Sequence, residues 1–283
     1  MLTVLESIKL STEYLEKKGI ESPRVNAELL LAHILNCKRL DLYLSYDRPL
    51  SDREIELYRS FLKRRGQFEP CQYIIGSVEF YGLHFEVNPS VLIPRPETEL
   101  LVEEIITRYK DSTGLKILEI GTGSGNIAVS LTYHLSGAKI TATDISENAL
   151  KVAERNAVIN KTEGQIRFVL NDILKNNLDE SEFDLIVSNP PYVSQTEYHE
   201  LRPELKVYEP RVALTDESDG FIYFRTISDR ASSLLKDNGK LYFEIGEGQA
   251  DGVKLILEER GFSEIKIKND YLQIQRVISG IKN

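Results

Sequence analysis

The chain has few cysteines and no excess of positive charge, and each shortage excludes a class of protein. Its 283 residues include only two cysteines, Cys37 and Cys71, which are too few for a disulfide scaffold and lack the spacing of a metal site. Acidic residues outnumber basic ones by 44 to 35, which gives a net charge of −9. Proteins that bind the phosphate backbone of nucleic acids need a basic excess instead. We therefore expect no metal and no direct sequence-specific binding to nucleic acid.

The sequence also lacks a long apolar run. No window approaches the roughly 20 apolar residues of a membrane span, and the richest stretch is interrupted by His33 and Asn36. The N-terminus has no basic segment followed by an unbroken apolar one, so it does not resemble a signal peptide. The content of 41% hydrophobic and 28% charged residues is typical of a globular protein. We expect a cytoplasmic protein without a membrane partner.

The first quarter of the chain has the pattern of a small helical domain. Leu5, Ile8 and Leu15 recur at roughly helical spacing, and Gly19 follows as a stop signal. No alternating strand pattern appears in this part of the sequence. We predict a helical bundle over residues 1–75.

A short connection follows over residues 76–95. Its first half alternates around a Tyr-Gly pair, as a β-hairpin does, and its second half is rich in proline. The polar residues Arg95 and Glu97 at the end of this connection either close over a ligand site or form an ion-paired hinge. Two interpretations are also open for Glu209 and Arg211: they either pair with each other or border a substrate cleft.

Strands alternate with helices over residues 96–283. Compact apolar runs separated by helical stretches predict a mostly parallel sheet with helices on both faces. The last two runs are separated only by a short polar turn, which indicates an antiparallel pair at the end of the sheet. The seven expected strands lie at residues 116–120, 139–143, 166–170, 183–187, 240–245, 263–268 and 272–278.

A glycine-rich loop follows the first of these strands. It consists of Gly121, Thr122, Gly123, Ser124 and Gly125, and a helix begins after it. Glycines let a ligand approach the backbone closely and permit positive φ angles. The spacing G-x-G-x-G differs from the G-x-G-x-x-G loop that holds a pyrophosphate. It is better suited to a ligand with an adenosine and an amino-acid tail, which indicates S-adenosylmethionine.

Three carboxylates are placed to help bind that ligand. Asp144 ends the second strand, where an acidic residue accepts hydrogen bonds from both ribose hydroxyls; capping the next helix is the alternative, although Ser146 is better placed for it. Asp172 ends the third strand, where it either accepts the adenine amino group while Ile173 packs on the ring or forms a turn. Glu119 either stands near the ammonium group or is a solvated strand end.

The fourth strand ends in Asn189, Pro190, Pro191 and Tyr192. The two prolines fix the backbone and remove two N–H donors, so the side-chain oxygen of Asn189 and the carbonyl of Pro190 remain as acceptors. Such a pair suits a planar NH₂ group and aims its nitrogen at a methyl donor, while Tyr192 packs on the flat group. We expect Asn189, Pro190 and Tyr192 to be catalytic and Pro191 to complete the substrate site. No general base is needed, because the nitrogen attacks while neutral.

Together these motifs closely resemble the protein-(glutamine-N5) methyltransferases of peptide chain release factors, the PrmC or HemK family. The glycine loop occurs in many methyltransferases, so the specific signals are residues 69–99, 209–214 and 243–249. Phe221 and Gln273 depart from the family pattern outside the expected site. The resemblance implies an α/β fold: a seven-stranded, Rossmann-like class I SAM-dependent methyltransferase domain with a small N-terminal helical-bundle domain joined by a β-hairpin.

The resemblance also implies a reaction. The donor is S-adenosyl-L-methionine, which leaves S-adenosyl-L-homocysteine as product, and Asn189 joins the donor site. The substrate is the glutamine of the Gly-Gly-Gln motif in class I peptide chain release factors, whose amide is held by residues 189–192. Independently of the resemblance, we expect residues 1–75 to recognise the protein substrate, because no motif with a chemical role occurs in them. Two alternatives remain: a glutamine N5-methyltransferase of ribosomal proteins, and a methyltransferase of exocyclic amines in nucleic acids, against which the acidic charge counts.

Overall fold

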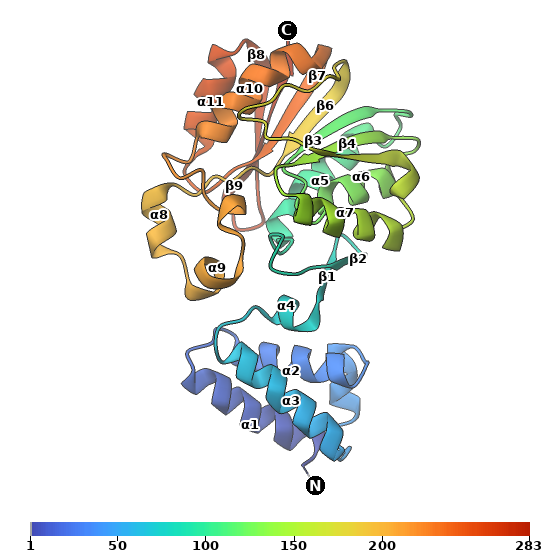
Figure 1. Cartoon of the computed structure of the whole chain (residues 1–283), viewed down its shortest axis with the longest axis vertical. Helices are drawn as coiled ribbons and strands as arrows, with labels where there is room; N and C mark the ends of the chain where they lie inside the picture. Colours follow the sequence, from blue (N-terminus) through green and yellow to red (C-terminus); the bar gives the residue numbers. More distant parts are fainter. Residues whose placement is uncertain (1) are drawn as a thin grey trace. The chain divides into compact units, whose positions relative to one another are not determined.

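The computed structural model describes residues 2–283, which form two units (Figure 1). The first unit extends to Ser77 and also includes Arg202–Tyr208. The second unit comprises Val78–Leu201 and Glu209–Asn283. The chain therefore enters the first unit a second time, between two strands of the second. Nothing in the local sequence pattern predicted this return.

The first unit is a helical bundle. Its apolar core includes Leu30, Leu42 and Leu62, together with the buried thiol of Cys71. Between residues 2 and 76 of this unit, no strand longer than a single bridge occurs. Its helices are α1 (Val4–Lys17), α2 (Pro23–Ile34), α3 (Asp52–Arg65), α4 (Cys71–Ile75) and α9 (Pro203–Tyr208), with a 3₁₀ turn over Arg39–Leu44.

The apolar face of α1 differs from the one that the leucine spacing predicts. Val4, Ile8 and Leu15 are buried, whereas Leu5 is 45% exposed. The helix begins only at Val4, with Thr3 as its cap. Because the buried positions recur every three to four residues from Val4, Leu5 falls beside the buried face.

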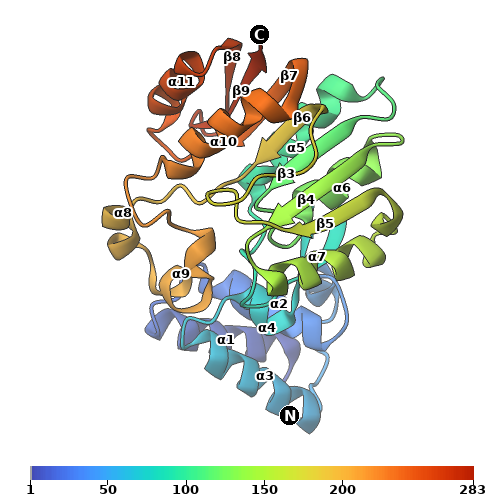
Figure 2. The ribbon, with the colours of Figure 1, turned by 45° about the horizontal axis from the view of Figure 1, so that its top comes forward.

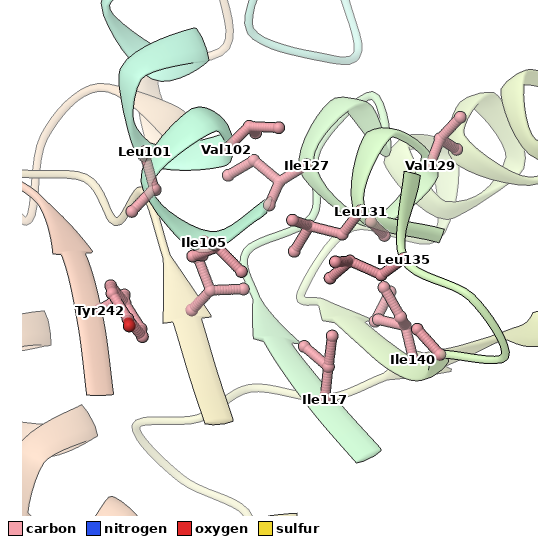
Figure 3. Packing of buried hydrophobic residues seen from close by; sticks show 14 of the residues in the cluster. Leu101, Val102, Ile105, Ile117, Ile127, Val129, Leu131, Leu135, Ile140 and Tyr242 are labelled. Carbon is pink, nitrogen blue, oxygen red and sulfur yellow. The ribbon is translucent and has the colours of Figure 1, made fainter. Parts of the chain in front are cut away.

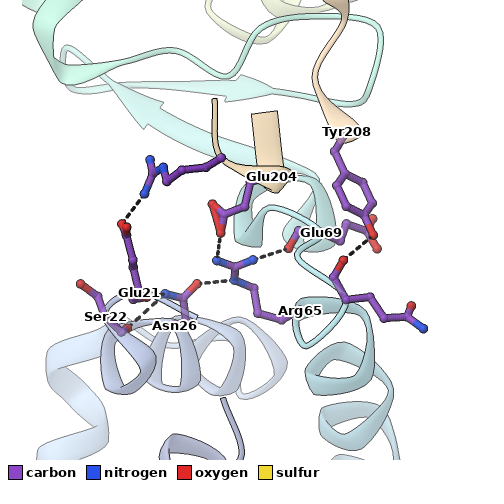
Figure 4. Close-up of polar contacts among 9 residues, drawn as sticks. Glu21, Ser22, Asn26, Arg65, Glu69, Glu204 and Tyr208 are labelled. Carbon is purple, nitrogen blue, oxygen red and sulfur yellow. Dashed lines mark hydrogen bonds and ion pairs between the residues drawn. The ribbon is translucent and has the colours of Figure 1, made fainter. Parts of the chain in front are cut away.

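Polar side chains attach the returning segment Arg202–Tyr208 to the bundle (Figure 4). Arg65, at the end of α3, is only 3% exposed and forms an ion pair with Glu204. Its guanidinium also donates to Asn26 Oδ1 at 2.8 Å and to the carbonyl of Glu69 at 3.1 Å. Because a buried charge is costly unless it is paired and hydrogen-bonded, these contacts define one position for the segment.

The second unit contains a seven-stranded sheet in the order β5-β4-β3-β6-β7-β9-β8. The first five strands in this order are parallel, and β9 runs antiparallel to both β7 and β8. The predicted α/β fold with an antiparallel end is thus confirmed. The strands are β3 (Lys116–Ile120), β4 (Lys139–Asp144), β5 (Ile166–Leu170), β6 (Phe183–Ser188), β7 (Leu235–Glu244), β8 (Phe262–Asn269) and β9 (Gln275–Lys282).

The last strand starts three residues later than predicted, because the turn before it is longer. Asp270 Oδ1 accepts the backbone N–H groups of Leu272 and Ile274 and so closes this turn. Gln273 within the turn has a φ of +64°, a conformation that favours glycine. A glycine, which the resemblance leads us to expect at this position, would adopt this conformation more readily.

Helices cover both faces of the sheet (Figure 2). Alternate strand residues point to opposite faces: Ile117 and Leu185 pack in one apolar core, and Leu118 and Ile186 in the other. Figure 3 shows the first core, with α5 and α6 against the sheet. The covering helices are α5 (Pro96–Tyr109), α6 (Asn126–His134) and α7 (Glu147–Ile159) on one face and α10 (Ile222–Leu234) and α11 (Ala250–Glu259) on the other.

A two-stranded hairpin of β1 (Ser77–Phe80) and β2 (Leu83–Glu86) precedes this sheet. Phe80 and Phe85 are buried in the core that also contains α5 and α6. Asn156 of α7 accepts the N–H of Glu86 at 2.7 Å and donates to its carbonyl at 3.0 Å. The hairpin is therefore an integral part of the second unit. Over residues 2–283, no helix is long and apolar enough to cross a membrane.

Candidate active site

A cleft opens at the carboxyl edge of the parallel strands, within the second unit. The loops that follow β3, β4, β5 and β6 line it, which is where open α/β sheets bind ligands. The structure brings most of the predicted site residues together here. They are Gly121, Thr122, Gly123, Ser124, Asp144, Asp172, Ile173, Asn189, Pro190 and Pro191.

The glycine loop leaves open space where side chains would otherwise stand. Gly121 and Gly123 have φ angles of +77° and +54°, and a Cβ at either would have no neighbour within 4 Å. Gly125 serves a different purpose, because its Cβ would lie 3.0 Å from that of Ala153 on α7. It is the N-cap of α6 with a φ of +81° and does not line the cleft.

Asp144, the last residue of β4, is tied to the loop. Its Oδ2 accepts the N–H of Gly123 at 2.8 Å, and its Oδ1 accepts the N–H of Ser146 at 2.9 Å. Burial raises the pKa of Asp144, and these N–H groups act in the opposite direction. Ser146 caps α7 by accepting the N–H of Ala149. Asp144 is thus free of the capping role, and its carboxylate keeps lone pairs for a ligand.

Glu119 lies behind the loop and is 1% exposed, so the interpretation as a solvated strand end is wrong. Its Oε2 accepts the hydroxyl of Thr122 at 2.7 Å and the N–H of Ala128 at 3.2 Å, which joins the loop to α6. Its Oε1 has no hydrogen-bond partner among the described residues. Burial raises the pKa of Glu119 from 4.5 to about 8. Its contact with an ammonium group stays a prediction.

The raised pKa of Glu119 predicts a pH-dependent stability. The folded chain retains the proton that the unfolded chain loses near pH 4.5, so the stabilisation is complete below that pH and is lost as the pH rises through about 8. Between about pH 5 and pH 8, the free energy of unfolding of the wild type should therefore fall. In Glu119→Gln we expect this fall to be smaller by about 1–4 kcal/mol. Denaturant titrations of the ligand-free proteins measure this difference, and parallel pH profiles would contradict it.

Asp172 and Ile173 follow β5 and line the cleft. Asp172 also has the turn role that was its alternative: its Oδ1 accepts the N–H of Leu174 at 3.0 Å, and Lys175 Nζ lies 3.0 Å from its Oδ2. The Ile173 side chain is 5% exposed and packs into the second core of the sheet. A bound ring would therefore meet a rigid apolar surface.

Asn189 directly follows β6, and its Nδ2 donates to Thr98 Oγ1 at 3.2 Å. Thr98 belongs to the first turn of α5 and also lines the cleft. Neither this helix nor the place of Thr98 was predicted from the sequence, because the segment between the connection over residues 76–95 and the first expected strand at residue 116 was given no element. The pattern Pro-x-Thr-Glu at residues 96–99 could have indicated the start of this helix. Pro96 is its first residue, and acidic residues occupy its first turn.

Tyr192 lies outside the cleft lining. Its ring packs against the second core of the sheet. The Cδ2 atom of this ring would lie 3.1 Å from a Cβ placed on Gly246. The carbonyl of Tyr192 accepts Gln249 Nε2 at 2.9 Å. The residue thus holds the segment after the prolines against the loop after β7, and its contact with a substrate amide stays a prediction.

The polar residues at the start of α5 and after α9 pair across the rim of the cleft. Arg95, which lines the cleft, forms an ion pair with the buried Glu209, whose other oxygen accepts the N–H of Ile93 at 3.2 Å. Arg211 pairs instead with Glu217 at 3.1 Å. Arg95 therefore forms an ion pair, while a role in a hinge and a role in closure over a ligand both stay predictions. Over residues 2–283, no group of three or more His, Cys, Asp or Glu residues could hold a metal ion.

Comparisons with known proteins agree with this geometry. The family profile described as "PrmC N-terminal domain" matches residues 6–76, and "Methyltransferase small domain" matches residues 96–205. The release factor glutamine methyltransferase of Chlorobaculum tepidum is 42% identical over 98% of this chain and 96% of its own length. That of Fusobacterium nucleatum is 39% identical over 97% of this chain and 77% of its own length.

This chain belongs to the release factor glutamine methyltransferase family. It is therefore a methyltransferase whose methyl donor is S-adenosylmethionine. A solved structure, a methyltransferase from Pyrococcus furiosus, is 19% identical with a TM-score of 0.54 and covers 83% of this chain and 100% of its own. At that identity the likeness shows the fold alone.

The residues of the cleft fit the family's donor. The open space beside Gly121 and Gly123 would accept an amino-acid tail without a clash. The remaining lone pairs of Asp144 suit two ribose hydroxyls, and the apolar Ile145 and Ile173 in the lining suit an adenine ring.

We expect Asp144→Ala to weaken donor binding about 10- to 150-fold. Loss of hydrogen bonds to a charged acceptor costs roughly 1.5–3 kcal/mol, and the loop also loses its tie at Gly123. Calorimetric titration with the donor measures the change, with thermal unfolding as the control for the fold. An unchanged donor affinity would contradict the assignment of Asp144 to the donor site.

Proposed function

We propose that this protein transfers a methyl group from S-adenosylmethionine to the side-chain amide nitrogen N5 of a glutamine. The substrate is the glutamine of the Gly-Gly-Gln motif in class I peptide chain release factors. The names of the relatives support the substrate, and the placement of Asn189, Pro190 and Pro191 in the same cleft as the glycine loop supports the chemistry.

The residues of the cleft divide into two groups in this proposal. Gly121–Ser124, Asp144, Asp172, Ile173 and Asn189 hold the donor, and Gly125 supports the loop by its close approach to Ala153. Asn189, Pro190 and Pro191 hold the glutamine amide, and Tyr192 fixes the segment that follows them. Because β3 and β6 are neighbours in the sheet, the loops that follow them bring the two groups next to each other at one edge.

The donor, when bound, supplies an electrophilic methyl group on a positively charged sulfur. The side-chain oxygen of Asn189 and the carbonyl of Pro190 accept the two N–H groups of the glutamine amide and so orient its nitrogen for attack. These acceptors also stabilise the positive charge that develops on that nitrogen, which then loses one proton. Positioning and electrostatics therefore provide the catalysis.

The helical unit, in this proposal, recognises the release factor and takes no part in the chemistry. A glutamine side chain is small and common, so the cleft by itself cannot select one glutamine among many. All of the residues that line the cleft come from the second unit. We also propose a cytoplasmic location, because class I release factors act in translation.

Parallel transfer assays separate this function from its alternatives. The protein is incubated with tritiated donor and, in turn, a class I release factor, ribosomal proteins, ribosomal RNA and DNA. We expect incorporation into the release factor at least about 100-fold above the other substrates, which corresponds to roughly 2.7 kcal/mol of discrimination. Preferred labelling of a ribosomal protein or of a nucleic acid would support the corresponding alternative instead.

A further inference from the structure

Glu244, the last residue of β7, is a buried carboxyl group beside the cleft. Ser188 of β6 lies opposite Phe243 of β7, so Asn189 and Glu244 follow at the same edge of neighbouring strands. Glu244 is 2% exposed, and its Oε2 has no hydrogen-bond partner among the described residues. Asn189 and Thr98 line the cleft, whereas Glu244 does not. A carboxyl group is costly to bury, so its presence here calls for a physical reason.

Glu244 lies beside a hydrogen-bonded pair of side chains. Asn189 Nδ2 donates to Thr98 Oγ1 at 3.2 Å. Burial raises the pKa of Glu244 to about 7, whereas the nearby polar groups of Thr98 and Asn189 lower it. The three residues come from the start of α5, the end of β6 and the end of β7.

A carboxylate beside an amide fixes the orientation of that amide. Above about pH 7 the Glu244 carboxyl is ionised, and an ionised carboxylate only accepts, whereas a primary amide donates at its nitrogen and accepts at its oxygen. Asn189 therefore turns its NH₂ group toward Thr98 and Glu244, which leaves Oδ1 available to the cleft. A flipped amide would place Oδ1 against the carboxylate, and two facing acceptors in a buried site are unfavourable.

We propose that Glu244 is a positioning residue for methyl transfer: together with Thr98 it holds the Asn189 amide with its oxygen toward the substrate NH₂ group. This inference rests on the proposed role of Asn189 as an acceptor. Glu244 itself contacts neither donor nor substrate. The burial of Glu244 strengthens its influence on the orientation of the Asn189 amide, because water does not compete for the polar groups there.

The test compares Glu244→Gln with the wild type in the release factor assay. A glutamine of the same shape offers an NH₂ group that can donate to a flipped Asn189, so both amide orientations become available. Above about pH 7 we expect kcat to fall about 10- to 100-fold, because the charge that orients the buried amide is lost, and donor affinity to stay within about threefold. Glu99→Gln is the matched control, because Glu99 also lies in the first turn of α5 and, among residues 2–283, accepts a hydrogen bond from the N–H of Tyr81 alone.

Two further comparisons distinguish positioning from a purely structural role. Thr98→Val removes the hydroxyl and should lower kcat as Glu244→Gln does, whereas Thr98→Ser retains it and should be at least about tenfold more active than Thr98→Val. In an Asn189→Ala background, Glu244→Gln should have no further effect, because Glu244 acts only through that amide. The Thr98 pair carries the test if Glu244→Gln does not fold.

The possible results have separate meanings. A folded Glu244→Gln variant with more than about a third of the wild-type kcat would overturn the inference. Equal losses in Thr98→Val and Thr98→Ser, or full additivity with Asn189→Ala, would do the same. If the wild type fails to methylate the release factor in this assay, the proposed function itself fails, and this outcome is distinct from all of the others.

Discussion

Asn189→Ala should lower the turnover number for release factor methylation by about 10²–10³-fold while the fold is retained. Removal of one positioned transition-state contact typically has an effect of this size. The substitution deletes the side-chain oxygen that we assign to the substrate amide and the Nδ2 that donates to Thr98. Single-turnover kinetics with saturating donor measure the chemical step.

A matched control uses Asn160, which lies beyond the end of α7 and outside the cleft lining. Its Nδ2 donates to the carbonyls of His84 and Asn156. Asn160→Ala deletes the same atoms and should leave turnover within about threefold. Some loss of donor affinity is expected in Asn189→Ala, because this residue also borders the donor site. A folded Asn189→Ala variant with more than about a third of wild-type turnover would refute the acceptor role.

Deletion of the helical residues up to Ser77 should reduce activity on an intact release factor by on the order of 100-fold or more, as expected when a recognition surface is lost. Donor binding should remain within a few-fold, because the residues that line the cleft all lie in the second unit. A short Gly-Gly-Gln peptide should be a poor substrate for both forms, with little difference between them.

The structure adds a requirement to this experiment. The segment Arg202–Tyr208 loses its partners Asn26 and Arg65 in the deletion, so donor titration and thermal unfolding must first show that the fragment folds. If it does not, the ratio of activity on intact release factor to activity on the peptide, measured with the full chain, tests the same idea. Equal rates of the folded fragment and the full chain on intact release factor would contradict it.

The sheet and the glycine loop could be predicted because their signals are local. Parallel strands are buried on both faces and form continuous apolar runs such as residues 116–120. The positive φ angles of Gly121 and Gly123 require the residue type that identifies the loop. For the same reason, the edge that carries Asn189 followed directly from the order of strands and loops.

Other features depend on contacts between distant residues and have no local signal. Glu244 lies in an apolar run, and only the register of β7 beside β6 places it next to Asn189. The buried Arg65 and its partner Glu204 resemble surface charges in the sequence, although they hold a segment that interrupts the second unit. The place of Tyr192 after two prolines predicts its contact with the substrate, whereas its neighbours Gly246 and Gln249 follow β7 and have no signal near Tyr192 in the sequence.

Mass spectrometry of a class I release factor, after incubation with this protein and S-adenosylmethionine, tests the proposed function most directly. Fragmentation of the peptide that contains the Gly-Gly-Gln motif locates the added methyl group. We predict one methyl group on the side-chain nitrogen of that glutamine, present with the wild type and absent with Asn189→Ala. An unmodified glutamine, or a methyl group on another residue, would contradict the proposal.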